Sequence, residues 1–524
     1  KTQRKMRMET KDQVTKLQLK IEELELEIKN LHETVTFLTR KLFGRSSETS
    51  KSLKIEGQMS LFDEAEVEAD PEAIEPTLEE VKLLIRKKYK GQRKEKLDNL
   101  PHKKVLFKLD SDDLSCPQCT TDLKRVGEEF VRSEVEYIPA QLNVIDYYRE
   151  TYECRSCKNT DEPYMEKTPM PLPVIPHSFA SPSSVAHVMY QKFVNALPFY
   201  RQEKDWLNLG LNLTRQTMSN WTLIAARDWL MPILDLLHQK MLKERYLHAD
   251  ETRVQVLNEK DRKNTTDSYM WVYGTYKDSE FPIRIFEYHP TRSGDHAKEF
   301  LKGFSGYLVT DAYKGYEKVE DITRCYCWSH LRRYFVDALP SDINKPEATL
   351  PTQAIEYCKK LFAIEKELET LSAKERKIQR QERSKPVLDA FWSWVDINKD
   401  NCLPKSKLYK AFNYAVNQKE GFMNFLEDGN IAISNNLAEN SIRPFTIGRK
   451  NWLFSGSPEG AKASAAVYSI IETAKANDLN PYKYLLYIFQ YMPGVRFEEE
   501  PEWLEDFLPW NPDVQTFCKS QASK

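Results

Sequence analysis

The sequence lacks any apolar run of the roughly 18 residues that can span a bilayer. It also lacks an apolar leader, because residues 1–20 are charged throughout, unlike a signal peptide. Apolar residues still make up 40% of the chain and charged residues 30%, which is typical of globular domains with a polar surface. We therefore expect a cytoplasmic protein without a membrane segment, and the length of 524 residues predicts several domains rather than one.

A net charge of one sign is nearly absent as well. The formal charge is -2 at pH 7, which argues against a uniformly basic nucleic-acid binder. The charges are segregated, however, with acids gathered in residues 63–80 and lysines and arginines in residues 82–104. The basic stretch from Arg86 to Lys96 could lie along a phosphate backbone, or it could be an ordinary solvated charge run.

Disulfides are not expected, because nine cysteines are an odd number and the chain is predicted to be cytoplasmic. Four cysteines are instead paired by spacing, in Cys116-Pro-Gln-Cys119 and Cys154-Arg-Ser-Cys157. Two such knuckles can close a tetrahedral thiolate site around one structural Zn²⁺, and four thiolates leave no open position for catalysis. The alternative is reduced cysteines without metal, since the 34 intervening residues exceed the commonest gap.

Residues 14–42 carry an apolar heptad repeat without proline or glycine. Valine and isoleucine occupy the a positions up to Val35, and leucine occupies every d position, a combination that favours two parallel strands. We therefore predict a homodimer held by a parallel coiled coil over residues 1–44. The alternative is a helix packed against its own globular body.

Two more segments are expected before the helical part of the chain. Residues 45–80 have few apolar side chains and predict an acidic linker, and residues 81–168 hold the basic stretch and the zinc module. Between the two cysteine pairs, residues 134–138 and 144–148 alternate as strands do, which predicts a module resembling a zinc ribbon.

A helical segment is predicted for residues 177–243, after a proline-rich boundary. Within it, a helix at residues 201–206 and a second helix capped by Thr214 flank a turn that contains Gly210, as in a helix-turn-helix. The second helix would present polar side chains to DNA. The residues predicted to contact DNA there are Arg215, Gln216, Ser219 and Asn220. Ordinary packing of short helices is the alternative.

From residue 244 the pattern changes to short apolar strands, with a helix predicted at residues 295–302. The strands are predicted at residues 246–256, 269–276, 283–288, 306–311 and 322–328. This order matches a ribonuclease H-like α/β sheet, in which the first and fourth strands are neighbours. Asp250 in the first strand and Asp311 at the end of the fourth can therefore share one site, although 61 residues separate them in sequence.

Breaking and joining phosphodiester bonds is well served by two divalent ions about 4 Å apart, held by hard oxygen ligands. Two aspartates need a third acid from another element, and Glu439 is the best candidate. Asn435 and Asn436 offer amide groups beside it, and a helix-like turn with an Asn cap is expected directly after it. The cations predicted to contact DNA phosphates there are Arg443, Arg449 and Lys450. Each acid alone has an ordinary alternative as a strand-end, turn or helix-surface carboxylate.

These segments together resemble the transposase family of insertion sequence 66. The resemblance covers nearly the whole chain, including the zipper-like N-terminus and the zinc-finger cysteines. The segments that carry it are His248-Ala-Asp250-Glu-Thr252, Thr310-Asp311-Ala-Tyr-Lys-Gly-Tyr316, Cys327-Trp-Ser-His-Leu-Arg-Arg333, Asn435-Asn-Leu-Ala-Glu439 and Arg443-Pro-Phe-Thr-Ile-Gly-Arg-Lys-Asn-Trp-Leu-Phe454. Ser434 and Asn440 differ from the family pattern, which often has an acid and an arginine at those places.

The resemblance implies a multidomain α+β DDE transposase that cuts insertion-sequence ends and transfers the strand to target DNA. It implies that Asp250, Asp311 and Glu439 are the catalytic triad and bind two Mg²⁺ or Mn²⁺ ions. The remaining segments would be residues 244–330 and 431–480 for the two parts of the catalytic core, 331–430 for a helical insertion, and 481–524 for a C-terminal segment. The partners would be terminal inverted repeats, target DNA and small accessory proteins of the same element, and the protein would lie on the nucleoid when bound to DNA.

Four residues of the Cys327 segment are not part of the triad, and their roles have to be considered separately. Arg332 and Arg333 are predicted to contact phosphate, whereas Cys327 and His330 could bind metal but more often serve packing in such a setting, so no role is assigned to them. The main alternative function is a non-catalytic dimeric DNA-binding regulator, for which the coiled coil, zinc module and helix-turn-helix would suffice. The acid triad discriminates between the two functions.

Overall fold

The structure is a computed structural model. The residues that it describes are 140–154, 165–340 and 349–519, together with 104, 106, 128 and 130. The predicted coiled coil, acidic linker and basic stretch lie outside the described residues, as do Cys116, Cys119 and Cys157. The chain divides into two compact units, and nearly all the described residues belong to the unit that contains Leu142–Lys524.

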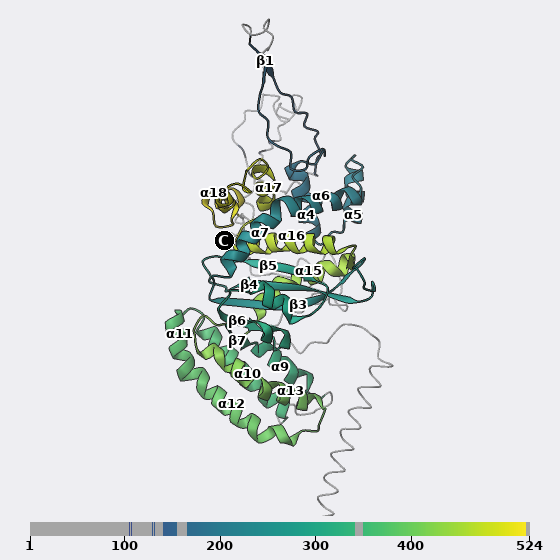
Figure 1. The fold of residues 1–524 in the computed structure, drawn as a ribbon. Coiled ribbons are helices and arrows are strands. Elements are labelled where there is room, and N and C mark those ends of the chain that lie inside the picture. Colours follow the sequence, from purple (N-terminus) through teal and green to yellow (C-terminus); the bar gives the residue numbers. More distant parts are fainter. Residues whose placement is uncertain are drawn as a thin grey trace, which may run out of the picture. The chain divides into compact units, whose positions relative to one another are not determined.

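A mixed sheet with the strand order β5-β4-β3-β6-β7 organises this unit (Figure 1). Its strands are β3 (Tyr246–Val256), β4 (Asp267–Thr275), β5 (Arg284–His289), β6 (Gly306–Thr310) and β7 (Ile322–Tyr326). β3, β4 and β5 form an antiparallel meander, and β6 and β7 run parallel to β3 on its other side. The predicted neighbourhood of the first and fourth strands is confirmed, because Leu247 of β3 pairs with Leu308 of β6.

The side of β3 that faces β6 is paired with strands only at its two ends. Residues 246–248 pair with β6, and Gln255 and Val256 pair with the short strand β8 (Phe454–Ser455). Between these ends, no strand of the described chain pairs with β3 on that side. The Asn435 side chain donates a hydrogen bond to the Ala249 carbonyl there instead (2.8 Å). The sheet is therefore open beside Asp250, a predicted catalytic acid.

Both edges of the sheet are covered by side chains from helical segments. Along β5 lies helix α16 (Pro458–Ala476), whose Ser469 and Thr473 hydroxyls accept hydrogen bonds from the backbone N–H groups of Phe286 (2.7 Å) and Arg284 (2.9 Å). At the other edge, Asn424 donates to the carbonyl of Arg324 in β7 (2.8 Å). The edge groups that could pair with a foreign strand are thus partly satisfied within the chain.

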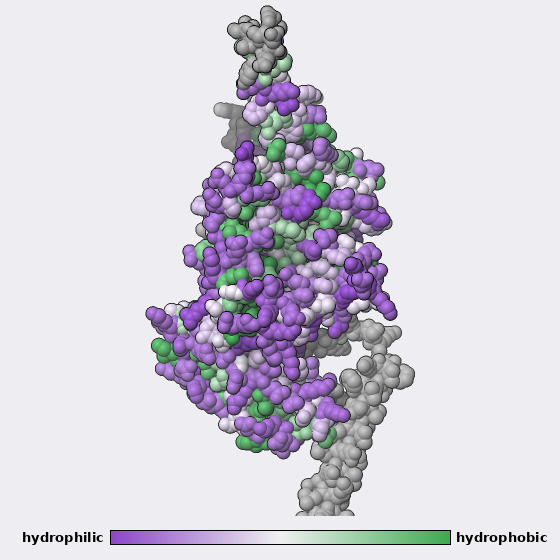
Figure 2. All heavy atoms as spheres, viewed as in Figure 1, coloured by the Kyte–Doolittle hydropathy of each residue, from purple (hydrophilic) through white to green (hydrophobic). Residues whose placement is uncertain are grey.

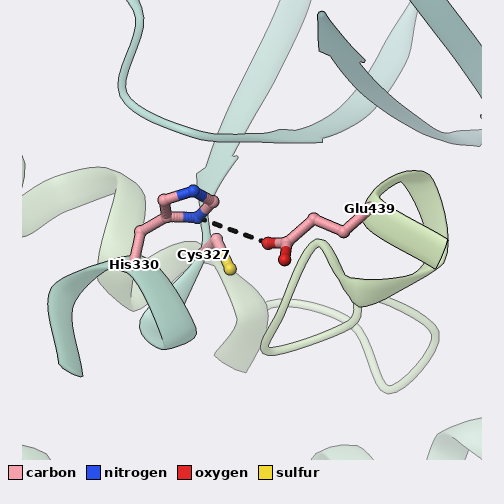
Figure 3. A group of neighbouring side chains, drawn as sticks. All are labelled: Cys327, His330 and Glu439. Atoms are coloured by element: carbon pink, nitrogen blue, oxygen red, sulfur yellow. Dashed lines mark ion pairs between the residues drawn. The ribbon is translucent and has the colours of Figure 1, made fainter. Parts of the chain in front are cut away.

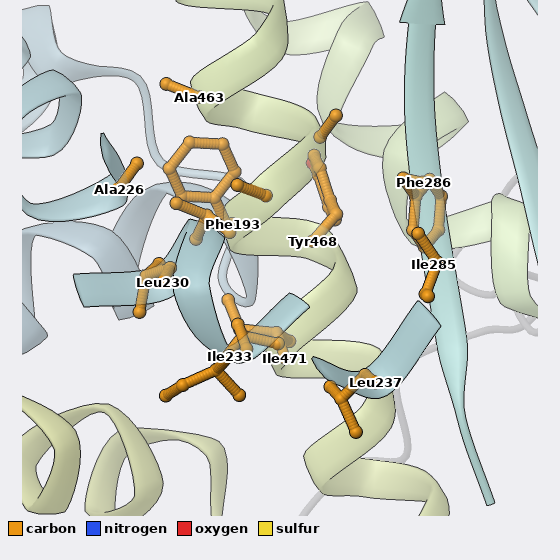
Figure 4. Close-up of a cluster of buried hydrophobic side chains, with 14 of the residues drawn as sticks. Phe193, Ala226, Leu230, Ile233, Leu237, Ile285, Phe286, Ala463, Tyr468 and Ile471 are labelled. Carbon is orange, nitrogen blue, oxygen red and sulfur yellow. The ribbon is translucent and has the colours of Figure 1, made fainter. Parts of the chain in front are cut away.

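One hydrophobic core lies where the helices pack against β3, β4 and β5 (Figure 4). The helices are α4 (Pro182–Phe193), α5 (Phe199–Asn208), α6 (Arg215–Ala225), α7 (Met231–Met241), α8 (Gly294–Phe300), α16 and α17 (Pro481–Tyr491). A π-helical turn at Ala226–Leu230 (η3) joins α6 to α7. Tyr468 of α16 meets Phe193 of α4 edge to face, with ring centroids 5.2 Å apart. The hydrophobic side chains gather inside, and the visible face is mostly hydrophilic (Figure 2).

The segment predicted as a helical insertion forms a second core of its own, packed against β6 and β7. Its helices are α9 (Trp328–Asp337), α10 (Leu350–Glu367), α11 (Ala373–Gln379), α12 (Lys385–Asn398), α13 (Lys407–Asn417) and α14 (Lys419–Met423). Arg380, between α11 and α12, is fully buried and pairs bidentately with Glu365 (2.8 and 2.6 Å). Its guanidinium also donates to the carbonyls of Phe425, Asp428 and Ile431. All five guanidinium N–H groups have acceptors, so this buried charge anchors the chain that returns from the insertion to the core.

One predicted strand is absent, and another ends earlier than predicted. Residues 144–148 form no strand, and the short hairpin in this region pairs β1 (Thr151–Glu153) with β2 (Met165–Lys167). Val144 and Tyr148 are each 90% exposed, so the alternating pattern has no described partner strand to bury it. β7 ends at Tyr326, and Trp328 instead begins α9, because its side chain is buried in the insertion core.

The predicted turn between α5 and α6 is present. Gly210, with φ +95°, lies after the end of α5 in a conformation that suits glycine. Thr214 caps α6 as expected, because its hydroxyl accepts a hydrogen bond from the backbone N–H of Thr217 (3.2 Å). Over the described part of the chain, no helix is both long and apolar enough to cross a membrane.

Truncation of Ile471 to alanine should lower the free energy of unfolding by about 2–5 kcal/mol, because it removes a fully buried side chain and leaves a cavity. Denaturant unfolding followed by tryptophan fluorescence measures the change. The matched control is Ile397→Ala, whose side chain is 71% exposed and should change stability by less than about 0.5 kcal/mol. Equal midpoints for the two variants would contradict this description of the core.

Candidate active site

The three predicted acids come from three elements and meet beside the opening in the sheet. Asp250 lies in the middle of β3, Asp311 directly follows β6, and Glu439 lies in the first turn of α15 (Asn436–Trp452). Burial raises the pKa of Asp250 well above its usual value, and the negative charges of Glu251, Asp311 and Glu439 raise it further. The structure therefore brings the three acids within electrostatic range of one another.

The expected position of Glu439 needs a correction. The sequence predicted that this residue precedes an Asn-capped turn, whereas it lies inside the first turn of α15. Asn435 does occupy the cap position, but its side chain makes no capping hydrogen bond to the helix. The amide turns inward to β3 instead, because the unpaired middle of that strand offers it buried partners.

Asn435 connects three elements around the acids and is fully buried. Its side-chain nitrogen donates to the Ala249 carbonyl of β3 (2.8 Å), and its side-chain oxygen lies 3.1 Å from Nδ1 of His248. An amide oxygen only accepts, so Nδ1 of His248 carries the proton. The backbone N–H of Asn435 donates to the Sγ of Cys327 (3.1 Å), directly before α9. One side chain thus fixes the start of α15, and with it Glu439, against the strand that carries Asp250.

A fourth acid and an arginine complete the cluster, and sequence reasoning missed both. Glu251 follows Asp250 in β3, and burial and Asp311 raise its pKa while Arg292 opposes the rise. Arg292 donates from Nε to Glu251 Oε1 (2.8 Å), and its Nη2 lies 4.0 Å from Asp311 Oδ2. The guanidinium also stacks on the Tyr313 ring at 3.9 Å. Arg292 lies in the loop after β5, far from both acids in sequence, so only the folded sheet shows the contact.

Asp311 is oriented by its own turn. Its Oδ1 accepts the backbone N–H of Tyr313 (2.9 Å), and Tyr316 donates to Glu251 Oε2 (2.8 Å) in the following turn. The side chain of Arg324 in β7 donates to the carbonyl of Asp311 (2.9 Å). The carboxylate is therefore oriented by the local backbone, and the backbone of Asp311 is held by the neighbouring strand.

Glu439 lies next to Cys327 and His330, to which the sequence assigned no role (Figure 3). Its Oε1 is 3.6 Å from Nδ1 of His330, and its Oε2 is 3.7 Å from Nη2 of Arg333. Cys327, His330 and Glu439 offer three ligand atoms that all lie within 4.8 Å of one another. Burial lowers the pKa of His330, and Glu439 opposes that shift. The Cys-x-x-His spacing at the start of α9 was the available signal for this neighbourhood.

The side chains predicted to contact phosphate lie in different places around the acids. Arg333 is half-exposed beside Glu439, whereas Arg332 is partly buried and lies near Cys358 of α10. Arg443 is one turn beyond Glu439 on α15, and its buried Nε has no hydrogen-bond partner among the described residues. Arg449 donates to Thr252 (3.3 Å). A groove of about 290 Å³ along β3 and α15 is lined by Arg253, Val254, Gln255, Asp267, Arg449, Lys450 and Leu453.

The residues predicted to read DNA lie on α6 and are not part of the acid cluster. Arg215, Gln216 and Asn220 are exposed, and Ser219 is half-buried. Met218 and Trp221 of the same helix are buried in the core, so the polar residues lie on its outer side. Of the four predicted zinc ligands the structure describes only Cys154. The geometry of the zinc module therefore stays a prediction.

A ribonuclease H-like strand order with one acid in the first strand, one after the fourth and one on a later helix is the architecture of the DDE enzymes that cut and join DNA. The comparison with known families agrees. The chain belongs to the transposase family of insertion sequence 66, because the model described as "Transposase IS66 family" matches residues 177–463, more than half of the chain. It is accordingly a catalytic DDE transposase with a role in transposition.

Three further family models match outside that range. They are the "zinc-finger binding domain of transposase IS66" at residues 113–158, the "Transposase C of IS166 homeodomain" at residues 30–105 and the "IS66 C-terminal element" at residues 469–510. The zinc-finger match contains all four predicted zinc ligands and implies bound zinc. The DDE family implies divalent metal ions at the acids, and a transposase implies DNA binding.

Two proteins of Sinorhizobium fredii are similar to this chain over most of their length. The uncharacterized protein y4hP is 29% identical over 501 residues, which are 90% of this chain and 87% of that protein. The uncharacterized protein y4jD is 29% identical over 426 residues, which are 79% of this chain and 80% of that protein. The similarity therefore extends across the modules rather than over the catalytic core alone.

Replacement of Asn435 by alanine should destabilise the protein by about 1–3 kcal/mol for each buried group left without a partner. The groups affected are His248 Nδ1 and the Ala249 carbonyl. Denaturant unfolding measures the loss. Asn436→Ala is the control, because the neighbouring amide is exposed and should change stability by less than about 0.5 kcal/mol. Equal stability of the two variants would show that Asn435 does not hold α15 against β3.

Proposed function

We propose that this transposase cuts DNA at the ends of its insertion sequence and joins the freed ends to target DNA, with Asp250, Asp311 and Glu439 holding two divalent cations, Mg²⁺ or Mn²⁺. The observation that carries the proposal is the gathering of three acids around buried Asp250, whose pKa is raised by burial first and then by the charges of Glu251, Asp311 and Glu439. Without cations, such a cluster of negative charges lowers the stability of the folded protein. Arg292 contacts the cluster but pairs mainly with Glu251.

The residues present fit such ions. Carboxylate oxygens are the hard ligands that Mg²⁺ prefers, and Glu439 Oε1 is buried without a hydrogen-bond partner among the described residues. The three acids do not form one compact group of ligand atoms. Ligands of two ions about 4 Å apart need not do so, because they span two coordination spheres. When bound, the ions would activate the attacking oxygen and stabilise the leaving oxygen.

The chain's own residues would orient the reacting groups. Asp250 lies two residues beyond the stretch of β3 that pairs with β6, and Asp311 directly follows β6, so the pairing of these two strands brings the two acids near each other. Arg333 and Arg443 flank Glu439 and would bind the phosphates on either side of the scissile bond. In the first step water oxygen attacks phosphorus and the P–O3′ bond breaks, which leaves a 3′-hydroxyl. In the second step that hydroxyl attacks a target phosphate, and a target P–O3′ bond breaks.

DNA would be held beyond the acids by two surfaces. The groove with Arg253, Arg449 and Lys450 is formed by β3 and α15, the elements that also carry Asp250 and Glu439. The outer side of α6 offers Arg215 and its polar neighbours. The proposal further includes a homodimer through the coiled coil of residues 1–44, one structural Zn²⁺ at the four paired cysteines, and accessory proteins of the same element. Support for these comes from the heptad pattern, the cysteine spacing and the family resemblance.

Neutralising any one of the three acids should lower strand transfer by at least about a hundredfold, since even outer-shell changes at metal sites can cost that much. The variants are Asp250→Asn, Asp311→Asn and Glu439→Gln, assayed on terminal inverted-repeat DNA with Mg²⁺ or Mn²⁺. Metal-free DNA binding should persist, and Asp250→Asn should be no less stable than the wild type because it removes a buried repulsive charge.

The matched control for the triad is Asp321→Asn, an exposed carboxylate in the turn before β7, which should retain full activity. Full activity of a triad variant would show that the replaced acid is not catalytic. Full strand-transfer activity in all three variants, with DNA binding intact, would favour the non-catalytic DNA-binding regulator.

Arg215→Ala should weaken DNA binding and make its logarithmic salt dependence shallower by about one, as expected for the loss of one phosphate contact. Binding is measured by fluorescence anisotropy at several salt concentrations. Arg496→Ala is the control, because that arginine is exposed in the C-terminal part of the chain and pairs with Glu499 (3.6 Å). An unchanged salt slope for Arg215→Ala would show that Arg215 makes no phosphate contact.

A further inference from the structure

Three side chains at the junction of β7, α9 and α15 offer three different ligand atoms to one point. Cys327 is the residue before α9, His330 lies in the first turn of α9, and Glu439 lies in the first turn of α15. Figure 3 shows the imidazole and the carboxylate directed toward each other with the thiol beside them. In the described part of the chain this is the one group of three or more histidine, cysteine or acidic side chains whose ligand atoms lie within 4.8 Å of one another.

Hydrogen bonding does not account for this arrangement. Nδ1 of His330 and Oε1 of Glu439 are 3.6 Å apart, which is too long for a hydrogen bond. Both atoms are buried and have no hydrogen-bond partner among the described residues. Two nitrogen or oxygen ligands bound to a tetrahedral ion at about 2.0–2.1 Å lie about 3.3–3.4 Å from each other. The observed separation is therefore close to that of two ligands on a shared ion.

Cys327 is placed to complete such a site. Its Sγ accepts the backbone N–H of Asn435 (3.1 Å), and it lies at the N-terminus of α9, where helix N–H groups favour negative charge. Hydrogen bonds from outer groups to ligand atoms are the usual support of metal sites.

The ligand set selects a class of ion. One sulfur, one imidazole nitrogen and one carboxylate oxygen suit Zn²⁺ and similar borderline-soft cations, whereas Mg²⁺ prefers oxygen alone. We propose that Cys327, His330 and Glu439 bind one zinc-class divalent cation, with the fourth tetrahedral position open. On binding, the ion forms a bond to Sγ and the thiol proton leaves to solvent.

The ion would regulate the active site because Glu439 is shared. A zinc-class cation held by Cys327 and His330 would draw the Glu439 carboxylate away from the ions at Asp250 and Asp311, and strand transfer would fall. This consequence rests on the proposed function, since it needs Glu439 to be a catalytic ligand. The binding site itself does not, because it depends only on the three side chains.

The test measures Zn²⁺ bound per full-length chain, without DNA or Mg²⁺, in Cys327→Ala, His330→Ala and the wild type. The wild type should bind one more Zn²⁺ per chain than either variant, because the cysteines of the zinc-finger segment are unchanged in all three. With Co²⁺ in place of Zn²⁺, the wild type should show sulfur-to-cobalt absorption that exceeds that of Cys327→Ala. Equal zinc content and equal absorption in the wild type and both variants would overturn the proposal.

Cys358→Ala is the matched control, since Cys358 of α10 is as fully buried as Cys327 and lies outside the group; this variant should bind as much zinc as the wild type. If Cys327→Ala fails to fold by circular dichroism, His330→Ala decides the result, because its side chain is 20% exposed and tolerates truncation better. Extra zinc retained in a folded His330→Ala would also overturn the proposal.

Activity separates the two hypotheses. Added Zn²⁺ should inhibit Mg²⁺-dependent strand transfer more in the wild type than in His330→Ala. Loss of the extra zinc in Cys327→Ala, together with full activity of Asp250→Asn, would sink the proposed function and leave the zinc site standing. If Asp250→Asn is inactive and the wild type binds no extra zinc, the zinc site is overturned and the proposed function stands.

Discussion

The candidate active site depends on one buried amide that joins segments far apart in the chain. Asn435 pairs with His248 and Ala249 of β3 through its side chain and with Cys327 through its backbone, so the strand of the first acid, the start of α9 and the start of α15 share one set of hydrogen bonds. A buried amide without partners is costly, and this favours a single register for α15. The position of Glu439 follows from that register.

Around this amide the chain concentrates negative charge where β3 lacks a strand partner. Three other acids interact electrostatically with Asp250, while Arg292 lies near Asp311 and Arg333 lies near Glu439. The metal-free protein is therefore electrostatically unfavourable at the acid cluster, where the proposed function places divalent cations. Burial raises the pKa of Asp250 and also strengthens its attraction for a bound ion, because both effects arise from the low local dielectric.

The helical insertion affects the site through the segment that leads from the insertion back to the sheet. Between Asp311 and Glu439 the chain forms a separate core, and Glu439 must still lie beside Asp250 and Asp311. Arg380 holds the carbonyls of Phe425, Asp428 and Ile431, and the backbone N–H of Trp328 donates to the carbonyl of Ile433 (3.0 Å). These contacts fix the segment just before Asn435. A long insertion can thus be accommodated without loosening the acid cluster.

The sequence by itself determined the family, the strand order and the chain positions of the acids, because period-two strands and short motifs are local patterns. It placed β3 at its observed bounds but extended β7 into α9, since an apolar run does not tell whether it is buried by a sheet or by a helical core. Only the tertiary structure decided that Asn435 faces β3 rather than capping α15, that Arg292 reaches Glu251 and Asp311, and that His330 lies beside Glu439. The physical reason is that these contacts join residues separated by tens to hundreds of positions, and their partners are set by packing rather than by any local preference of the chain.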